Sequence, residues 1–396
     1  MQPSGYQISF ICNNHQCTNT AACTSFSIMI FILFIHLKLT KPTCAIGFQL
    51  TRYIEACEIT LMKLKKWSVY VSRRILDPAI PMISKECNVI VANHRGNRPA
   101  TRSELLKAVH DKDAILCTLL DKIDAKVMDV AGSNLKVISS YSTGVDHIDT
   151  KEATKRGIYV TSTGDILTEA TADIAFALIL AISRRIIQGH ELVTHKRWKY
   201  GWDPHLLLGS DVHNMTIGIL GLGRIGSAVA RRAKGFDMNI IYHNLHSRNI
   251  QMEEQVRTKH VDMEELVRES DFLSLHCSLN NKSYHLINKE ILRKMKKNAY
   301  IINTARGQII NELHLIKALN QRWIAGAGLD VFEKEPPSPD NPLLKMKNVV
   351  VLLPHIGSAT FFTRTKMAEV AAKNLLNVLK RKSAIYLANP EVVNQE

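Results

Sequence analysis

The feature that most constrains this chain of 396 residues is a glycine-rich loop near its middle. Gly221, Gly223 and Gly226 form a G-x-G-x-x-G pattern directly after the apolar run 216–220. The first glycine permits a tight strand-to-helix turn, the second lets the backbone approach a pyrophosphate, and the third lets the helix pack closely on the strand. A dinucleotide-binding domain usually opens with this loop. The long segment before it therefore predicts that another domain comes first.

Composition and charge narrow the class of protein. The chain is 46% hydrophobic and 22% charged, which is enough apolar material for two cores and gives no sign of disorder. Its formal net charge of +15 suits anionic ligands such as a phosphorylated cofactor or a carboxylate. Nucleic acid is the competing partner, but no basic run is interleaved with aromatic residues and no DNA-binding signature occurs. We therefore expect no nucleic-acid partner.

The cysteines argue against a metal or thiol site. Five of the eight fall in the first 57 residues, and only Cys87, Cys117 and Cys277 belong to the rest. None of these three lies in a C-x-x-C pair or a Cys/His cluster, so no metal site is expected and small buried side chains are the simpler interpretation. This usage is typical of a reduced, cytoplasmic protein.

Residues 1–64 differ in character from the rest and are not expected to belong to the folded protein. They contain no Lys or Arg before Lys38 and no acidic residue before Glu55. The apolar run 26–35 is shorter than the roughly 20 residues of a membrane-spanning helix. A weak signal or anchor is one interpretation, and a disordered leader or a start-site artefact are the two favoured ones. Membrane association is therefore not expected.

From Lys66 onward, short apolar runs alternate with helical patterns, which predicts parallel βαβ units. The predicted strands are 67–71, 89–91, 114–116 and 135–138 in the first part, and 216–220, 239–242, 271–275, 299–302, 325–331 and 349–353 in the second. A long apolar helix that opens at Thr168 and runs to Arg185 marks the crossing between the parts. The last predicted helix, 363–382, has a broad apolar face and is expected to pack on the first domain.

The fold class that follows is α/β, with two doubly wound parallel-sheet domains. A Rossmann coenzyme domain is inserted into a flavodoxin-like substrate domain. The predicted boundaries are 1–64 for the leader, 65–165 together with 356–390 for the substrate domain, and 166–355 for the NAD(P)-binding domain.

The residues after the second strand of the coenzyme domain predict which dinucleotide binds. An NAD-preferring site offers Asp or Glu about twenty residues beyond the glycine loop to hold the ribose 2'-hydroxyl. Residues 242–249 contain no acid but do contain His246, Ser247 and Arg248. We predict a preference for NADP(H), with Arg248 as the main 2'-phosphate contact and His246 secondary. The alternatives are that Arg248 is a solvated surface charge and that NAD(H) is used.

Three charged residues at later strand ends predict the chemistry. Arg306 has a planar fork that can hold a carboxylate and polarise a carbonyl. His355 can exchange a proton near neutral pH, and Glu335 can accept its other ring N–H. Ligands of open α/β sheets bind at the carboxyl ends of strands, and all three residues lie at or shortly after such ends. Together they suit the reduction of a 2-keto acid.

At this point a family resemblance can be named. From about Lys66 to the C-terminus the chain resembles the D-isomer-specific 2-hydroxyacid dehydrogenases, and most of all their glyoxylate/hydroxypyruvate reductases. The stretches that carry the resemblance are 135–147, 221–226, 303–307, 327–331 and 354–360. The leader has no counterpart in the family.

The resemblance implies roles for individual residues. Arg306, Glu335 and His355 take the catalytic roles, and the amides of Thr143 and Gly144 bind the substrate carboxylate. The implied substrate contacts are Thr143, Gly144, Arg306, Asp330, His355 and Ser358. The implied cofactor contacts are Gly221, Gly223, Arg224, Ile225, Gly226, Ser278, Thr304, Asp330 and Gly357, with Asp330 holding the nicotinamide carboxamide. Trp198 or Trp202 resembles a tryptophan inserted into the neighbouring subunit's site, and a homodimer is implied.

The expected function is NADPH-preferring reduction of small 2-keto acids, glyoxylate to glycolate and hydroxypyruvate to D-glycerate, with His355 as proton donor. One alternative is another D-2-hydroxyacid dehydrogenase such as a phosphoglycerate dehydrogenase. Formate dehydrogenase is disfavoured because Glu335 supplies a carboxylate partner for His355. A third alternative is a non-catalytic NAD(H)-sensing module like the corepressors that share this fold.

Overall fold

A computed structural model describes residues 66–94, 96 and 98–395. By its internal contacts, the described part of the chain from Trp67 onward forms one compact unit. The predicted leader 1–64 and its apolar run 26–35 lie outside the described residues. In the part of the chain that is described, no helix is long and apolar enough to cross a membrane.

The first part of the unit is a five-stranded parallel sheet with the strand order β2-β1-β3-β4-β5. Its strands are β1 (Trp67–Val71), β2 (Cys87–Val91), β3 (Ala114–Cys117), β4 (Val137–Ser140) and β5 (Tyr159–Thr161). The four strands expected from the sequence are confirmed, although β4 begins two residues later than predicted. The three-residue β5 was not predicted.

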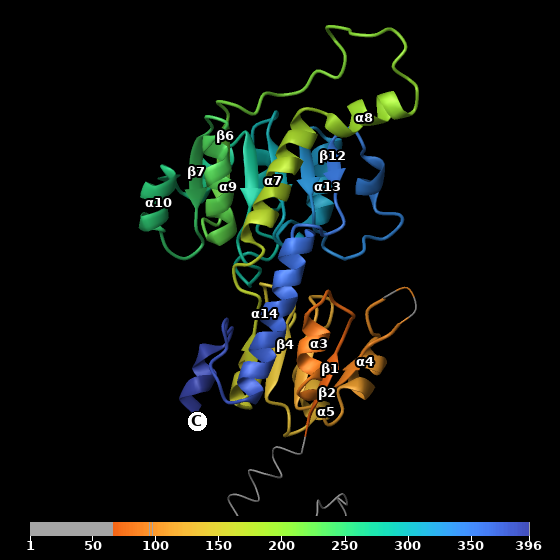
Figure 1. The fold of residues 1–396 in the computed structure, drawn as a ribbon. Helices are drawn as coiled ribbons and strands as arrows, with labels where there is room; N and C mark the ends of the chain where they lie inside the picture. The colour runs from red at the N-terminus through yellow and green to blue at the C-terminus, as the bar shows by residue number, and fades with distance from the viewer. Residues whose placement is uncertain (1–65, 95, 97, 396) are drawn as a thin grey trace, which may run out of the picture. The chain divides into compact units, whose positions relative to one another are not determined.

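Helices cover both faces of this sheet because the side chains of each strand alternate. Val69 and Val71 of β1 pack on one face with α3 (Ala79–Ser84) and α14 (Phe361–Leu379). Tyr70 packs on the other face, where the helices are α4 (Arg102–Ala108), α5 (Ala125–Ala131) and α6 (Thr150–Lys155). Figure 1 shows α14 lying against this sheet beside β4, as expected for the last predicted helix, which begins two residues earlier and ends three earlier than predicted.

The second part is a seven-stranded parallel sheet with the order β12-β11-β10-β9-β6-β7-β8. Its strands are β6 (Thr216–Leu220), β7 (Asn239–His243), β8 (Lys259–His260), β9 (Phe272–Leu275), β10 (Tyr300–Asn303), β11 (Gly326–Leu329) and β12 (Val350–Leu352). The six predicted strands are confirmed with ends that move by up to two residues. The two-residue edge strand β8 was not predicted.

Helices also cover both faces of the second sheet. Helices α7 (Thr168–Ser183) and α9 (Arg224–Lys234) pack on one face, where Figure 1 shows them side by side. The other face carries α11 (Met263–Glu269), α12 (Lys289–Lys294) and α13 (Glu312–Asn320), while α10 (Ile250–Val256) packs beside α9. Short 3-10 helices are η2 (Gly307–Ile309), η3 (Pro342–Lys345) and η4 (Pro390–Gln395).

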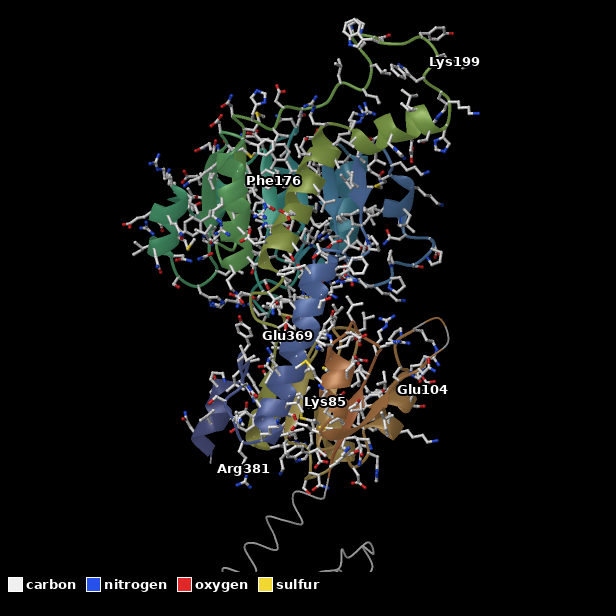
Figure 2. All side chains as sticks on the ribbon, viewed as in Figure 1. Lys85, Glu104, Phe176, Lys199, Glu369 and Arg381 are labelled. Carbon is white, nitrogen blue, oxygen red and sulfur yellow. The ribbon has the colours of Figure 1, made fainter. Side chains whose placement is uncertain are left out.

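The helix predicted from Thr168 to Arg185 is confirmed as α7, which ends two residues earlier than predicted. Helix α7 ends at Ser183, and Arg185 adopts a left-handed backbone with φ of 53° before α8 (Ile186–Thr194) begins. The separate helix α8 was not predicted. No residue of α8 is buried. Figure 2 shows the loop after α8, which carries Lys199, extending away from the seven-stranded sheet.

The order of the second sheet positions a ligand site. Strand β6 lies between β9 and β7. After β6 the chain adds β7 and β8 on one side of it, and then adds β9 to β12 on the other side. In open α/β sheets such a switch of direction leaves a crevice beyond the carboxyl ends of the strands. The glycine loop follows β6 at this point. The fold therefore brings the segments after β6, β9, β10, β11 and β12 to a common edge.

Candidate active site

One cleft of about 1570 Å³ collects most of the residues predicted to bind or react. It is lined by segments that follow strands of both sheets. Of the predicted site residues, the lining includes Thr143, Gly144, Arg224, Ile225, Ser278, Thr304, Arg306, Asp330, Glu335, His355, Gly357 and Ser358. Gly221, Gly223, Gly226, His246, Ser247 and Arg248 are not among the lining residues.

His355 and Glu335 form a hydrogen-bonded pair in this cleft. Nδ1 of His355 lies 2.8 Å from Oε2 of Glu335, and each side chain is about one quarter exposed, at 27% and 22%. An ionised carboxylate can only accept hydrogen bonds, so Nδ1 must carry the hydrogen that it donates. This fixes the tautomer and leaves Nε2 free to exchange a proton with a ligand.

Local backbone interactions hold the pair in place. His355 adopts φ of 55°, a left-handed conformation that non-glycine residues seldom use, and its amide donates to the carbonyl of Asp330. Oε1 of Glu335 accepts a hydrogen bond from the amide of Phe332 at 3.1 Å. The turn after β12 and the loop after β11 are thus tied together, and the imidazole and carboxylate meet as a consequence.

Asp330 is almost fully buried, with 1% exposure. Its two carboxylate oxygens accept hydrogen bonds of 2.7 Å from the amides of Ile356 and Gly357. Burial raises the pKa of this carboxyl, although the two amides act in the opposite direction. The resemblance implies a contact with the cofactor; in the structure Asp330 fastens the backbone that follows His355.

Arg306 follows β10 and lines the same cleft as His355. The side chain of Asn303 shapes its loop, because its amide donates to the carbonyl of Arg306 at 2.9 Å. A Cβ at Gly307 would lie 1.9 Å from the carbonyl carbon of Phe332, so only glycine lets this loop pack against the loop that carries Glu335. The close approach brings the guanidinium and the His355–Glu335 pair to one cleft.

The glycine loop fits a dinucleotide. Gly221 has φ of 101°, and a Cβ there would lie 2.7 Å from the amide nitrogen of Cys277, while a Cβ at Gly226 would lie 2.1 Å from the carbonyl of Gly221. Gly223, which precedes the eleven-residue helix α9, has open space around its missing side chain. Room beside a helix N-terminus suits a pyrophosphate. Thr304 lines the cleft, and its hydroxyl is buried without a hydrogen-bond partner among the described residues. A bound ligand could supply that partner.

The residues predicted to contact a 2'-phosphate lie outside the cleft lining, on the exposed segment between β7 and α10. Arg248 is 57% exposed there and pairs with Glu253 of α10. Its Nε lies 3.0 Å from Oε1 and its Nη2 lies 2.6 Å from Oε2, while the Tyr242 hydroxyl also donates to this carboxylate. Hydrogen bonding to Arg248 and Tyr242 lowers the pKa of Glu253 to about 2. The acid missing from 242–249 thus occurs five residues after Arg248, as Glu253. Its negative charge is paired with the Arg248 guanidinium.

Sequence reasoning missed Asp146 as a partner in the cleft. Its carboxylate pairs with Arg306, with Oδ1 at 2.9 Å from Nη2. Asp146 belongs to the stretch 135–147 that carried the resemblance, but the two residues are 160 positions apart. Only the tertiary structure joins them.

The described residues contain no group of three or more His, Cys, Asp or Glu that could hold a metal ion. Cys87 and Cys117 are buried, as expected, and Cys277 is half-buried. Burial raises the pKa of the Cys277 thiol to about 11 and lowers the pKa of its neighbour His276 to about 3. Neither residue is therefore an ionised nucleophile or a protonated acid at neutral pH.

Comparisons with known proteins agree with this geometry. Residues 176–357 match the family model of the D-isomer specific 2-hydroxyacid dehydrogenase, NAD binding domain. The chain is 50% identical over 326 residues to a glyoxylate reductase of Thermofilum pendens, covering 82% of this chain and 95% of the relative. It is 46% identical to a glyoxylate reductase of Pyrococcus horikoshii, covering 83% and 97%.

Solved structures show the same similarity. A crystal structure from Thermus thermophilus matches with a TM-score of 0.74 and 41% identity, covering 81% of this chain and 99% of that one. An NADPH-dependent glyoxylate/hydroxypyruvate reductase of Sinorhizobium meliloti, in complex with NADP and malonate, matches with a TM-score of 0.72 and 29% identity, covering 83% and 98%. With these relatives and this site, the chain belongs to the D-isomer-specific 2-hydroxyacid dehydrogenases and is an NAD(P)-dependent dehydrogenase.

Proposed function

We propose that this dehydrogenase reduces small 2-keto acids, glyoxylate to glycolate and hydroxypyruvate to D-glycerate, and prefers NADPH. The observation that carries the proposal is the presence of Arg306 and the His355–Glu335 pair in one cleft that also contains the residues beside the glycine loop. The names of the Thermofilum and Pyrococcus relatives support glyoxylate as substrate. The Sinorhizobium structure supports hydroxypyruvate and NADPH.

The proposed chemistry assigns one task to each charged side chain. When bound, the reduced nicotinamide supplies the hydride that forms the new C–H bond at the carbonyl carbon. Arg306 binds the carboxylate and polarises the carbonyl, which makes that carbon more electrophilic. His355 donates the proton on Nε2 to the developing alkoxide, so the product is the neutral hydroxyl. Glu335 stabilises the charge of the imidazolium before that transfer through its bond to Nδ1.

The lining of the cleft supports the proposed substrate contacts and part of the proposed cofactor contacts. Thr143 and Gly144 follow β4 and offer backbone amides to the substrate carboxylate, and Ser358 lies three residues beyond His355. We assign the cofactor to Gly221, Gly223 and Gly226, to Arg224 and Ile225 at the start of α9, and to Ser278, Thr304, Asp330 and Gly357. In this scheme 65–165 with 356–390 is the substrate domain and 166–355 the NAD(P)-binding domain.

The preference for NADPH is assigned to Arg248, with Ser247 and His246 beside it. Glu253 occupies Nε and one N–H of Nη2 on Arg248. A guanidinium has five N–H groups, so further donors remain on Arg248, and a pair of them matches the spacing of two phosphate oxygens. Because its charge is paired, Glu253 does not repel the phosphate as an unpaired acid would.

A homodimer is part of the proposal. Helix α8 buries none of its residues, and large apolar side chains are exposed on it and on the loop that follows. Trp198 and Trp202 on that loop are 52% and 83% exposed, which is unusual for large aromatic side chains. An exposed apolar arm of this kind fits a second copy of the chain, with one tryptophan near its cleft. A cytoplasmic location remains a prediction.

Initial rates with purified protein test the function. Glyoxylate and hydroxypyruvate are each supplied with NADPH and with NADH, and turnover is followed by loss of reduced-nicotinamide absorbance. We expect turnover of both acids and a higher kcat/KM with NADPH. Cofactor binding with negligible turnover would instead favour a dinucleotide-sensing module. Reduction only of a larger, phosphorylated keto acid, tested in the same assay, would favour a phosphoglycerate dehydrogenase.

The variant His355→Ala tests the proton donor. A positioned general acid contributes roughly 10² to 10⁴ in rate, so kcat should fall by at least about 100-fold. NADPH affinity, measured by fluorescence titration, should change little because the imidazole is not assigned to the cofactor. Full activity in this variant would refute the role of His355.

A further inference from the structure

The Arg306–Asp146 pair joins a residue that follows β10 to one that follows β4, across the cleft. Nε of Arg306 lies 3.1 Å and 3.2 Å from the two oxygens of Asp146, and Nη2 lies 2.9 Å from Oδ1. Both side chains are half-buried, at 24% and 32% exposure. Burial opposes ionisation of Asp146, but the charge and hydrogen bonds of Arg306 outweigh it and the pKa of the carboxyl is lowered. The pair is therefore ionised at neutral pH.

The hydrogen bonds of Arg306 leave a defined set of donors for a ligand. A guanidinium has five N–H groups: one on Nε and two on each terminal nitrogen. Asp146 takes the Nε group and one on Nη2, and the carbonyl of Ala305 takes one on Nη1 at 2.8 Å. One N–H on each terminal nitrogen remains. Two such donors match a carboxylate, or a carboxylate oxygen and an adjacent carbonyl.

The loop that carries Asp146 is fixed independently of Arg306. The hydroxyls of Ser140 and Ser142 lie 2.7 Å apart, and Thr143 donates its hydroxyl hydrogen to the carbonyl of Gly164 at 2.7 Å. Nε2 of His147 lies 3.2 Å from the Ser140 hydroxyl. Burial is the main cause that lowers the pKa of His147 to about 4, so this ring is neutral near pH 7 and Arg306 is the cation that Asp146 faces.

The guanidinium of Arg306 packs against Gly144 where a side chain would otherwise lie. A Cβ at this position would lie 2.2 Å from Nη2 of Arg306 and 2.9 Å from Oδ1 of Asp146. Any side chain there would push the guanidinium away from Asp146. Gly144 and the Asp146 carboxylate therefore determine one position of the Arg306 side chain. This position is directly beside the amides of Thr143 and Gly144, which we propose bind the substrate carboxylate together with Arg306.

We infer that Asp146 is a positioning residue for substrate binding, which holds Arg306 against Gly144 so that its two free N–H groups face the keto acid. This inference rests on the proposed function of Arg306. Asp146 does not touch the reacting atoms. It fixes the side chain that does, and it does so from the opposite side of the cleft.

The test uses Asp146→Ala and Asp146→Asn in the full chain. Without the carboxylate, Arg306 samples other rotamers, so Asp146→Ala should raise the KM for glyoxylate at least about 10-fold while kcat falls less than about 3-fold. Asp146→Asn retains one acceptor and should show a smaller increase. The inhibition constant of malonate, used as a non-reducible carboxylate probe, should rise in parallel with KM, and NADPH affinity should not change.

Two further variants separate positioning from a general structural effect. Gly144→Ala retains Asp146 but displaces the guanidinium, and it should also raise KM and the malonate inhibition constant. In an Arg306→Lys background, adding Asp146→Asn should change KM by less than about 2-fold, because the fork to be positioned is absent. Asp129→Asn is the matched control: it removes a carboxylate from the exposed pair with Arg156 and should leave all constants unchanged.

If the wild type reduces keto acids as proposed, two results would overturn the inference about Asp146. One is an Asp146→Asn protein with the wild-type melting temperature and unchanged KM and inhibition constant. The other is a decrease in KM, which would mean that Asp146 competes with the substrate for Arg306. Absence of keto-acid reduction by the wild type would instead overturn the proposed function. The wild-type rates therefore distinguish the two failures.

Discussion

Arg306 and Arg248 form the same kind of pair in two different environments. Each directs Nε and Nη2 at one carboxylate, Arg306 at Asp146 and Arg248 at Glu253. Arg306 lies in the cleft at 24% exposure, and its partner comes from the other sheet; Arg248 is 57% exposed, and its partner is five residues away. Solvent and salt weaken exposed pairs far more than half-buried ones. The same geometry should therefore matter much more at Arg306.

Replacement of Arg306 should give the largest effect of the comparison. Arg306→Ala removes the proposed carboxylate clamp and leaves Asp146 half-buried without its cation. Truncating one partner of a partly desolvated, hydrogen-bonded charge pair is costly, and kcat/KM for glyoxylate should fall about 10³-fold. Steady-state rates with NADPH measure this loss. A change below about 10-fold would place the substrate elsewhere, and an equal loss of NADPH affinity would show that the lesion is not confined to substrate binding.

Replacement of Arg248 should give a smaller and more selective effect. Arg248→Ala removes a charged donor to the 2'-phosphate. The free energy that a hydrogen bond to a charged group contributes corresponds to an increase of about 10- to 100-fold in the KM for NADPH. The KM for NADH should stay within about 2-fold, because NADH lacks that phosphate. The ratio of the two constants is the measurement. If the ratio is unchanged, Arg248 is only a solvated surface charge.

The sequence predicted the parts of the site that depend on strand ends. Gly221, Arg306 and His355 each follow an apolar run, and the carboxyl ends of parallel strands share one edge of a sheet. The bond between His355 and Glu335 was also expected, because an imidazole in such a site needs a partner for its second nitrogen. The positions of these residues at the ends of predicted strands were enough to predict that they lie close together.

The missed features depend on tertiary contacts or on very short elements. The partner of Arg306 is 160 residues distant, and no periodicity links Asp146 to it. Glu253 lies beyond the segment 242–249 and is brought to Arg248 only by the fold of α10. Strand β8 has only two residues, which is too short for a pattern of apolar residues to indicate a strand. Local rules cannot detect such features.

The smallest expected effect is that of Glu253→Gln. This variant keeps an acceptor for Arg248 and Tyr242 but removes the charge, and exposed pairs contribute little, so the KM for NADPH should change by less than about 5-fold. In the wild type the pKa of Glu253 is lowered to about 2, and the pair is lost only as the pH falls through that value. The ratio of the NADPH and NADH constants should therefore not vary between pH 6 and pH 9 on account of Glu253. A change as large as that of Arg248→Ala would mean that Glu253 positions its arginine as strongly as we infer for Asp146, and the contrast between the two pairs would be wrong.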